Sequence, residues 1–229
     1  MLIQFLILIA LCLILYFLTN HTSITVYRIA FRITRNKTVT IGIVAALFLP
    51  GTILHELSHF FFALILRVRT GKLTIFPTVS ESGEVKAGSL EIARPDPFRH
   101  TLIGLAPMIV GLTATYFIGE YFFPHISLII TASYRTLLGL YCLWMITSTM
   151  FTSKRDLQAF LFVGPILFLI LLSLYLSGIR LSLTETASVQ IESFLVLLNQ
   201  TLGVASGIQL TVFILFQILL KITQRLIKS

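Results

Sequence analysis

Charge is scarce in this chain. Only 11% of its 229 residues are charged, whereas 56% are hydrophobic, and a soluble domain carries about 25% charged residues. This composition excludes an ordinary soluble domain and predicts an integral membrane protein. Acidic residues are rarer than basic ones, nine against 17, which gives a formal net charge of +8. Because the basic residues lie between apolar runs, we expect them to orient the chain and contact the lipid bilayer, and we expect no nucleic-acid partner.

Cysteine is also scarce. The first apolar run lacks the features of a signal peptide that is cleaved off. The two cysteines, Cys12 and Cys142, both lie in apolar runs. They are therefore expected to be buried thiols that indicate no redox compartment. Residues 1–18 lack the basic start and the Ala-x-Ala-like end of a cleaved signal peptide. We therefore expect this run to be retained as a helix.

The apolar runs predict an all-α polytopic membrane protein with about six transmembrane helices. The expected spans are residues 1–18, 38–66, 102–122, 134–151 and 157–176, with a last helix from about residue 201. A basic segment over residues 20–37 suits the membrane interface, and a second interfacial piece is expected before the last helix. Pro50-Gly51 divides the second run, which predicts a kink or an unwound turn there.

Three segments follow from this pattern. Residues 1–37 are the N-terminal transmembrane helix and its basic interfacial segment, residues 38–178 are the core, and residues 179–229 are the C-terminal interfacial segment and transmembrane helix. The one long polar connection holds two β-prone runs around a Gly-bearing turn. It predicts a small β-hairpin at about residues 70–95, between the second and third helices.

Loop charge predicts the orientation of the chain. With the amino terminus inside, the 17 basic residues divide into eleven inside and six outside. This distribution favours a multi-pass protein of the cell membrane with both termini in the cytoplasm. The hairpin would then also be cytoplasmic.

Ionisable residues are concentrated at His55-Glu56-Leu57-Ser58-His59, inside an apolar run. Histidines four apart share one helix face, so both imidazoles can reach one metal ion. Glu56 beside them can accept a proton from a water molecule at that metal. Ionisable side chains are expensive at membrane depth, so this concentration indicates function. The alternative is a polar patch that packs helices together, which needs neither this spacing nor a glutamate.

A catalytic zinc ion commonly has three protein ligands and one open position for water. Asp156, between the fourth and fifth expected spans, is the first candidate for the third ligand. Its alternative role is to cap the fifth helix, where an acidic side chain is favoured by the helix dipole. His100, at the entry to the third span, is the rival ligand. Asp96 lies between two prolines in the polar connection and is expected to be solvated.

The stretch from Leu49 to Ala63, which contains the His-Glu-x-x-His motif, strongly resembles the metal-binding helix of the site-2 protease family of intramembrane zinc metalloproteases. Residues 68–77 resemble the family's exit into a membrane-associated hairpin. Gly104-Leu105-Ala106-Pro107 resembles the motif that opens its next core helix. The resemblance covers about residues 49–160 and suggests a minimal member of the family. Two departures are that no Asn follows Pro107 closely and that Leu, in place of Gly, follows Asp156.

The resemblance implies an intramembrane zinc metalloendopeptidase that cleaves membrane-embedded substrates. In the family an Asp on a later helix completes the zinc site, and Asp156 falls where that residue is expected. The ligands of Zn²⁺ would then be His55, His59 and Asp156, with Glu56 as the general base. A substrate helix must unwind before its peptide bonds can be cut. The hairpin edge is expected to pair with the unwound strand, through a region that includes Leu73, Ile75 and Val79.

Two other classes of protein fit the same motif. A non-catalytic membrane scaffold or sensor would bind zinc without cleaving peptides. A membrane-anchored protease acting at the surface would hold its histidines at headgroup level. The distance from His59 to Arg67 is about 12 Å along a helix, which favours a buried site. The expected partners are a membrane-protein substrate helix and the lipid bilayer, and a homo-oligomer stays open.

Overall fold

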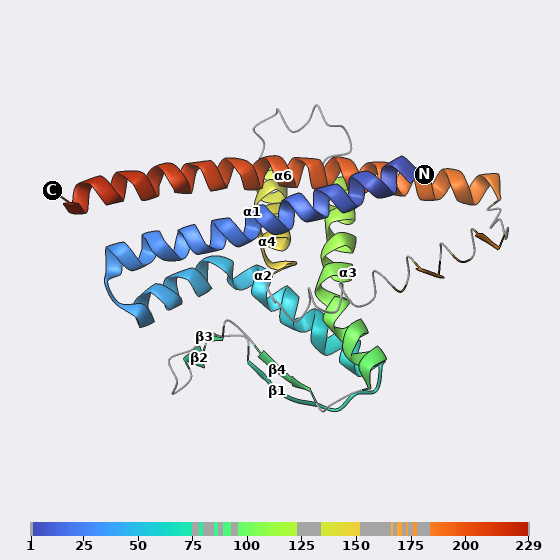
Figure 1. The fold of residues 1–229 in the computed structure, drawn as a ribbon, viewed down its shortest axis with the longest axis horizontal. Helices are drawn as coiled ribbons and strands as arrows, with labels where there is room; N and C mark the ends of the chain where they lie inside the picture. The colour runs from blue at the N-terminus through green and yellow to red at the C-terminus, as the bar shows by residue number, and fades with distance from the viewer. Residues whose placement is uncertain are drawn as a thin grey trace.

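The computed structural model describes residues 2–74, 78–79, 85–86, 89–92, 96–122, 134–151, 166, 169–170, 173, 176–177 and 184–228. Helices dominate this part of the chain (Figure 1). They are α1 (Leu2–Thr34), α2 (Lys37–Ile65), α3 (Pro97–Phe122), α4 (Tyr134–Thr149) and α6 (Glu185–Lys228).

Four of these helices, α1, α2, α3 and α6, are long and apolar enough to cross a membrane. Large apolar side chains along them are exposed, among them Ile3, Phe17 and Leu215, as expected where a helix faces lipid. These features are consistent with an integral membrane protein. Helix α4 has 16 residues, fewer than the roughly 20 that a span needs. The span expected at residues 157–176 lies largely outside the described residues, so a total of six spans stays a prediction.

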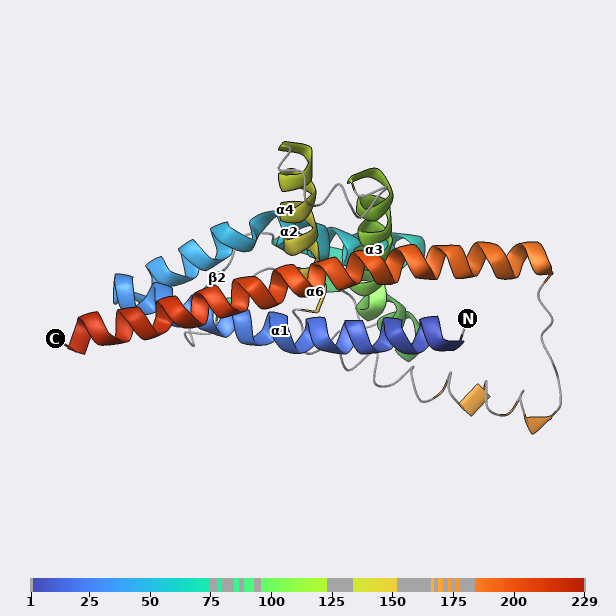
Figure 2. The same ribbon diagram turned by 90° about the horizontal axis from the view of Figure 1, so that it is seen from above.

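Helices α1 and α6 lie side by side and run in the same direction (Figures 1 and 2). Their hydrogen-bonded pairs advance together along both helices: Gln4 with Asn199, Thr19 with Gln209, and Thr25 with Gln217. The amino end of α1 and the carboxyl end of α6 therefore lie at opposite ends of the pair. This arrangement does not support the expectation that both termini lie on one side of the membrane.

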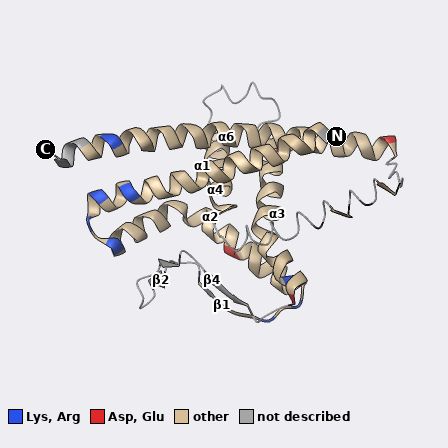
Figure 3. Ribbon diagram, viewed as in Figure 1, with Lys and Arg blue, Asp and Glu red and all other residues tan. Residues whose placement is uncertain are grey.

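The basic residues at the carboxyl ends of α1 and α6 and at the start of α2 lie at the same end of the molecule (Figure 3). Charge counting assigned the basic residues at the carboxyl end of α1 and at the start of α2 to the outside. It assigned those at the carboxyl end of α6 to the inside. The count assumed a strict alternation of sides along the chain. Parallel packing of α1 with α6 departs from that alternation.

Helices α3 and α4 run across the α1–α6 pair and extend from it toward α2 (Figure 1). The main buried cluster lies where these helices meet the pair. Its members come from α1, α3, α4 and α6: Leu15, Ile118, Leu143, Leu198, Leu202 and Ala205. A second cluster joins Val26, Phe48 and Met145 of α1, α2 and α4. Both clusters thus depend on α4, the shortest of the α-helices in the described part of the chain.

Helix α1 is longer than the sequence predicts, because it continues through the polar stretch that was expected at the membrane interface. The hydroxyls of Thr22 and Thr25 donate to the carbonyls of Leu18 and His21, each at 2.8 Å. These bonds satisfy the polar side chains within the helix itself. Val26 is also buried, so packing favours continuation of the helix over a separate interfacial segment.

Helix α6 is also continuous, with 44 residues in place of the expected interfacial piece and separate span. Contacts on both sides of the expected break hold it together. Asn199 donates to the backbone and the side chain of Gln4 on α1, and Thr201 packs against Gly119 of α3. Tertiary contacts therefore outweigh the polar residues that suggested a boundary near residue 201.

Helix α2 contains Pro50 and stays helical through it. Its axis changes direction about midway, in agreement with the expected kink (Figure 1). Asn36 caps its first turn by accepting from the backbone of Thr38 and Val39. At its other end, Arg67 has φ 54°, and the amide of Val68 donates to Ala63 at 2.9 Å. This is a Schellman-type ending with arginine in the left-handed position that glycine usually occupies.

Short antiparallel strands occupy the connection between α2 and α3. Strand β1 (Thr70–Thr74) pairs with β4 (Ser89–Ile92), with Leu73 opposite Leu90 and an irregularity between Thr70 and Leu73. Strand β2 (Thr78–Val79) pairs with β3 (Val85–Lys86), with Val79 opposite Val85. These strands lie within the connection for which the sequence predicts a hairpin.

The parallel α1–α6 pair can be tested by disulfide cross-linking. In a background with Cys12→Ser and Cys142→Ser, the pair Gln4→Cys and Asn199→Cys should cross-link on mild oxidation, because these side chains are in contact at 2.8 Å. The control pair is Gln4→Cys with Gln217→Cys, 18 residues further along α6, or about 27 Å away. Mass spectrometry of the linked peptides distinguishes the two. Preferential linking of the control pair would contradict the parallel arrangement.

Candidate metal centre

His55 and His59 lie one turn apart on α2, past the bend at Pro50. Their ring centroids are 4.9 Å apart and their planes meet at 86°, edge to face. His55 is buried and His59 is partly buried. The structure therefore places the two histidines next to each other, as their spacing predicts.

The His55 ring is held by the end of α4. Its Nδ1 lies 2.9 Å from the carbonyl oxygen of Thr149, the last residue of that helix. The last four carbonyls of a helix have no partner within the helix, and in an apolar environment each must find a donor elsewhere. The carbonyl can only accept, so Nδ1 of His55 is the donor.

The His59 ring is held by the second turn of α3. Its Nδ1 lies 2.8 Å from the carbonyl oxygen of Ile103. In a continuous helix this carbonyl would accept from the amide four residues later, but that residue is Pro107, which has no amide hydrogen. The proline therefore releases a carbonyl inside the helix, and His59 supplies the missing donor.

These two bonds fix the tautomer of each neutral imidazole. With the proton on Nδ1, Nε2 carries the lone pair that binds a metal ion. Zinc-binding histidines almost always donate their other ring nitrogen to a carboxylate, a backbone carbonyl or water. Both histidines of this motif meet that requirement through backbone carbonyls. Two imidazoles also suit zinc, although a catalytic site needs a third protein ligand besides them.

Glu56 and Ser58 complete the polar side of this turn. Glu56 is 8% exposed and Ser58 is 2% exposed, although both lie on a helix that is apolar enough to span a membrane. The Ser58 hydroxyl donates to the carbonyl of His55 at 2.6 Å. Burial of Glu56 beside the two rings places a carboxylate where it can accept a proton.

Gly51 allows α4 to approach α2 closely, one turn before His55. A Cβ atom at this position would lie 2.6 Å from the Thr149 side chain and 2.7 Å from the carbonyl oxygen of Met145. No side chain larger than hydrogen fits there without moving one helix. The small residue therefore brings the Thr149 carbonyl within reach of His55.

The structure leaves the third ligand open. Among the residues it describes, no three His, Cys, Asp or Glu side chains are grouped so that they could hold a metal ion. His100 is described and is exposed in the first turn of α3. Asp156 lies outside the described residues.

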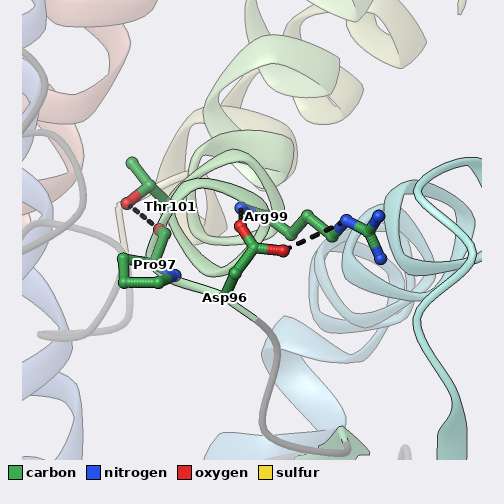
Figure 4. A network of polar contacts seen from close by, with 4 residues as sticks. All are labelled: Asp96, Pro97, Arg99 and Thr101. Atoms are coloured by element: carbon green, nitrogen blue, oxygen red, sulfur yellow. Dashed lines mark hydrogen bonds and ion pairs between the residues drawn. The ribbon is translucent and has the colours of Figure 1, made fainter.

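Asp96 is at the surface, as the sequence predicts. It caps α3 by accepting from the backbone amide of Arg99 at 3.0 Å, and its other oxygen pairs with the Arg99 side chain at 3.2 Å (Figure 4). Both side chains are about half exposed. These contacts assign Asp96 to the start of a helix.

The residues expected to contact substrate are placed only in part. Leu73 lies in β1 and Val79 in β2, whereas Ile75 lies outside the described residues. Each of the two described sheets has two strands. In this part of the chain, β1 therefore has one edge without a partner strand.

Sequence reasoning missed the two backbone acceptors, Thr149 and Ile103. One signal was available for Ile103, because a proline inside a helix always releases the carbonyl four residues before it. Gly51 was interpreted as part of a kink, and its role as a contact point between α2 and α4 was missed. The Thr149 carbonyl has no signal in the sequence, since any residue at a helix end offers the same atom.

Comparisons of the chain with protein families, with curated proteins and with solved structures found no match. The likeness to site-2 proteases therefore rests on the residues of the motif and its flanks.

A methyl group at Gly51 tests whether close packing of α4 orients His55. Gly51→Ala should lower the free energy of unfolding by about 1–3 kcal/mol through overpacking. It should also weaken zinc binding at least about tenfold, because the bond from His55 to Thr149 is lost or lengthened. Gly42→Ala is the matched control, since nothing lies within 4 Å of a Cβ there. Unfolding in mixed micelles and zinc titration calorimetry measure the two effects, and equal results for both variants would refute this role.

Proposed function

We propose that the protein is an intramembrane zinc metalloendopeptidase. The observation that carries the proposal is the pair of bonds from the Nδ1 atoms of His55 and His59 to the carbonyls of Thr149 and Ile103. A patch that only packs helices would not require both rings to use the same nitrogen, Nδ1, for these bonds. The motif, its burial and the acidic neighbour support the same conclusion.

In this proposal His55, His59 and Asp156 hold the zinc ion. Bound there, zinc would act as a Lewis acid and activate a water molecule for attack on a peptide carbonyl. Asp156 is seven residues beyond Thr149, and a chain of that length spans at most about 25 Å. Asp156 is therefore within reach of the helix end that contacts His55. His100 is the alternative ligand.

Glu56 is the general base. Its carboxylate accepts the proton of the attacking water and passes it to the nitrogen of the departing amine. The Thr149 and Ile103 carbonyls keep both imidazoles in the tautomer that can bind metal. The bend at Pro50 lies about one turn before this site, within a helix that stays continuous.

The proposed substrate is a membrane-protein helix that unwinds at the cleavage point. Its unwound backbone would add a strand to the edge of β1, near Leu73, that has no partner strand among the described residues. Ile75 and Val79 are proposed to extend this contact. The bilayer itself would exclude soluble peptides, which distinguishes this function from proteolysis at the membrane surface.

Replacing the general base separates catalysis from metal binding. Glu56→Gln should reduce cleavage of a single-span substrate to background while one zinc ion per chain is retained, because the amide cannot accept the proton. His55→Ala with His59→Ala should lose both. Protein reconstituted in vesicles with a panel of single-span substrates, together with metal analysis, measures these effects. Cleavage by the Glu56→Gln variant would refute the mechanism. Zinc binding without cleavage by the unaltered protein would favour the scaffold or sensor.

The third ligand can be identified by a matched pair of variants. Asp156→Ala should weaken zinc binding by at least about tenfold and abolish cleavage, because a ligand is lost. His100→Ala should leave both unchanged, since its side chain is exposed at the start of α3. Zinc competition with a chelating dye measures the affinities. The reverse result would assign His100 as the ligand.

A further inference from the structure

Gln209 is fully buried in the middle of α6, in a helix that is apolar enough to span a membrane. A buried amide must find partners for its donor and acceptor groups, since an unsatisfied polar group is costly in an apolar environment. Both groups of Gln209 are satisfied by other helices. Its Nε2 donates to the Thr19 hydroxyl of α1 at 3.0 Å. Its Oε1 accepts from the Ser148 hydroxyl of α4 at 3.3 Å.

These bonds belong to a closed ring of contacts. The Thr19 hydroxyl, which accepts from Gln209, lies 3.5 Å from the carbonyl oxygen of Thr147. Thr147 and Ser148 are neighbours on α4, so the chain of contacts returns to Gln209 through the α4 backbone. All four residues are at most 4% exposed. The ring is therefore shielded from competing water, and it fixes α6, α1 and α4 at one point.

The residue after Ser148 on α4 is Thr149, whose carbonyl orients His55 of the candidate metal centre. Thr149 accepts from Nδ1 of His55 at 2.9 Å. Three consecutive residues of α4, Thr147, Ser148 and Thr149, thus face α1, α6 and α2 in turn. Ser148 and Thr149 are adjacent in the last turn of α4, so the bond that anchors Ser148 to α6 also restrains the backbone that carries the Thr149 carbonyl.

We propose that Gln209 is a positioning residue for the metal centre. It acts through Ser148 on the last turn of α4 and so sets the position of the carbonyl that keeps His55 in the metal-binding tautomer. This inference rests on the proposed function only where it concerns zinc, since the tautomer of His55 exists without a metal ion. It assigns a role in the site to α6, which contributes no residue of the motif.

A matched control lies on the same helix. Gln217, eight residues further along α6, donates from Nε2 to the Thr25 hydroxyl of α1 at 3.1 Å. Gln209 and Gln217 thus make the same kind of bond between α6 and α1. Gln209 differs in that its Oε1 also accepts from the Ser148 hydroxyl of α4. Gln217→Leu therefore removes one hydrogen bond between α6 and α1 and spares the bond from Ser148 to Gln209.

The experiment uses full-length, metal-free protein in detergent micelles with ¹⁵N-labelled histidine. The ¹⁵N shifts of Nδ1 and Nε2 report which nitrogen carries the proton, and the His55 signals are assigned by their loss in His55→Gln. Gln209→Leu should transfer part of the His55 population to the Nε2–H tautomer and leave His59 unchanged, because His59 depends on Ile103 of α3. Zinc titration should then show a dissociation constant raised about tenfold. Gln217→Leu should change neither quantity.

Ser148→Ala gives a second, milder test, because it removes the hydroxyl and preserves the bond from Gln209 to Thr19. It should reproduce the effect of Gln209→Leu on His55, and it decides the question if Gln209→Leu does not fold. The inference is overturned if the folded variants keep the His55 tautomer of the unaltered protein, or if Gln217→Leu alters it equally. Failure of the unaltered protein to bind zinc would refute the proposed function, whereas the tautomer measurement would still test the role of Gln209.

Discussion

Backbone carbonyls that have no partner within their own helix impose the central constraint on this structure. In an apolar environment such a carbonyl must find a donor, because water cannot supply one. Two of these carbonyls lie beside α2. The Thr149 carbonyl has no amide partner within α4 because it lies at the end of that helix, and the Ile103 carbonyl has none within α3 because Pro107 lies four residues later. The donors that satisfy them are the two histidines of the motif, so helix packing and the orientation of the site depend on the same two bonds.

The same constraint explains why α4 connects distant parts of the chain. Its last turn offers several carbonyls and hydroxyls in succession, and α1, α2 and α6 each contribute a polar side chain to it. Close approach is possible because Gly51 leaves room for Thr149 and Gly111 leaves room for Met150. Apolar packing of Leu143 and Met145 accompanies these polar contacts. Helix α4, with 16 described residues, thus lies at the centre of the described structure.

The sequence predicts the elements of the site better than their supports. Histidine spacing on a helix is a local property, so the neighbouring rings of His55 and His59 follow from it directly. The place of Asp96 between two prolines in the polar connection likewise predicts its solvated side chain, whereas its role as a helix cap was not predicted. The partners of the histidines are main-chain atoms, which no residue type identifies. The single exception is Pro107, whose position implies a free carbonyl four residues earlier.

Longer-range features were harder to predict for a different reason. The boundaries expected near residues 18 and 201 were inferred from local polarity, but threonine hydroxyls and asparagine contacts satisfy the polar groups inside continuous helices. The parallel order of α1 and α6 depends on pairs nearly 200 residues apart in the sequence. Charge counting does not detect such pairs, because it treats each apolar run as an independent crossing. The sequence shows Gln209 and Gln217 as two amides in an apolar run. Their different hydrogen-bond partners become known only from the structure.

Interhelical hydrogen bonds in membranes average only about 0.6 kcal/mol, because side chains in the unpacked state also find partners. A released backbone carbonyl is different, since its helix offers it no alternative donor nearby. The bonds of His55 and His59 therefore contribute more to ring orientation than an average bond between two side chains would. Orientation set by the fold leaves little rearrangement for a ligand to induce, which is the condition under which a binding site is preorganised. The proline of α3 and the end of α4 thus each make available the carbonyl that orients one of the two histidines, and they do so independently.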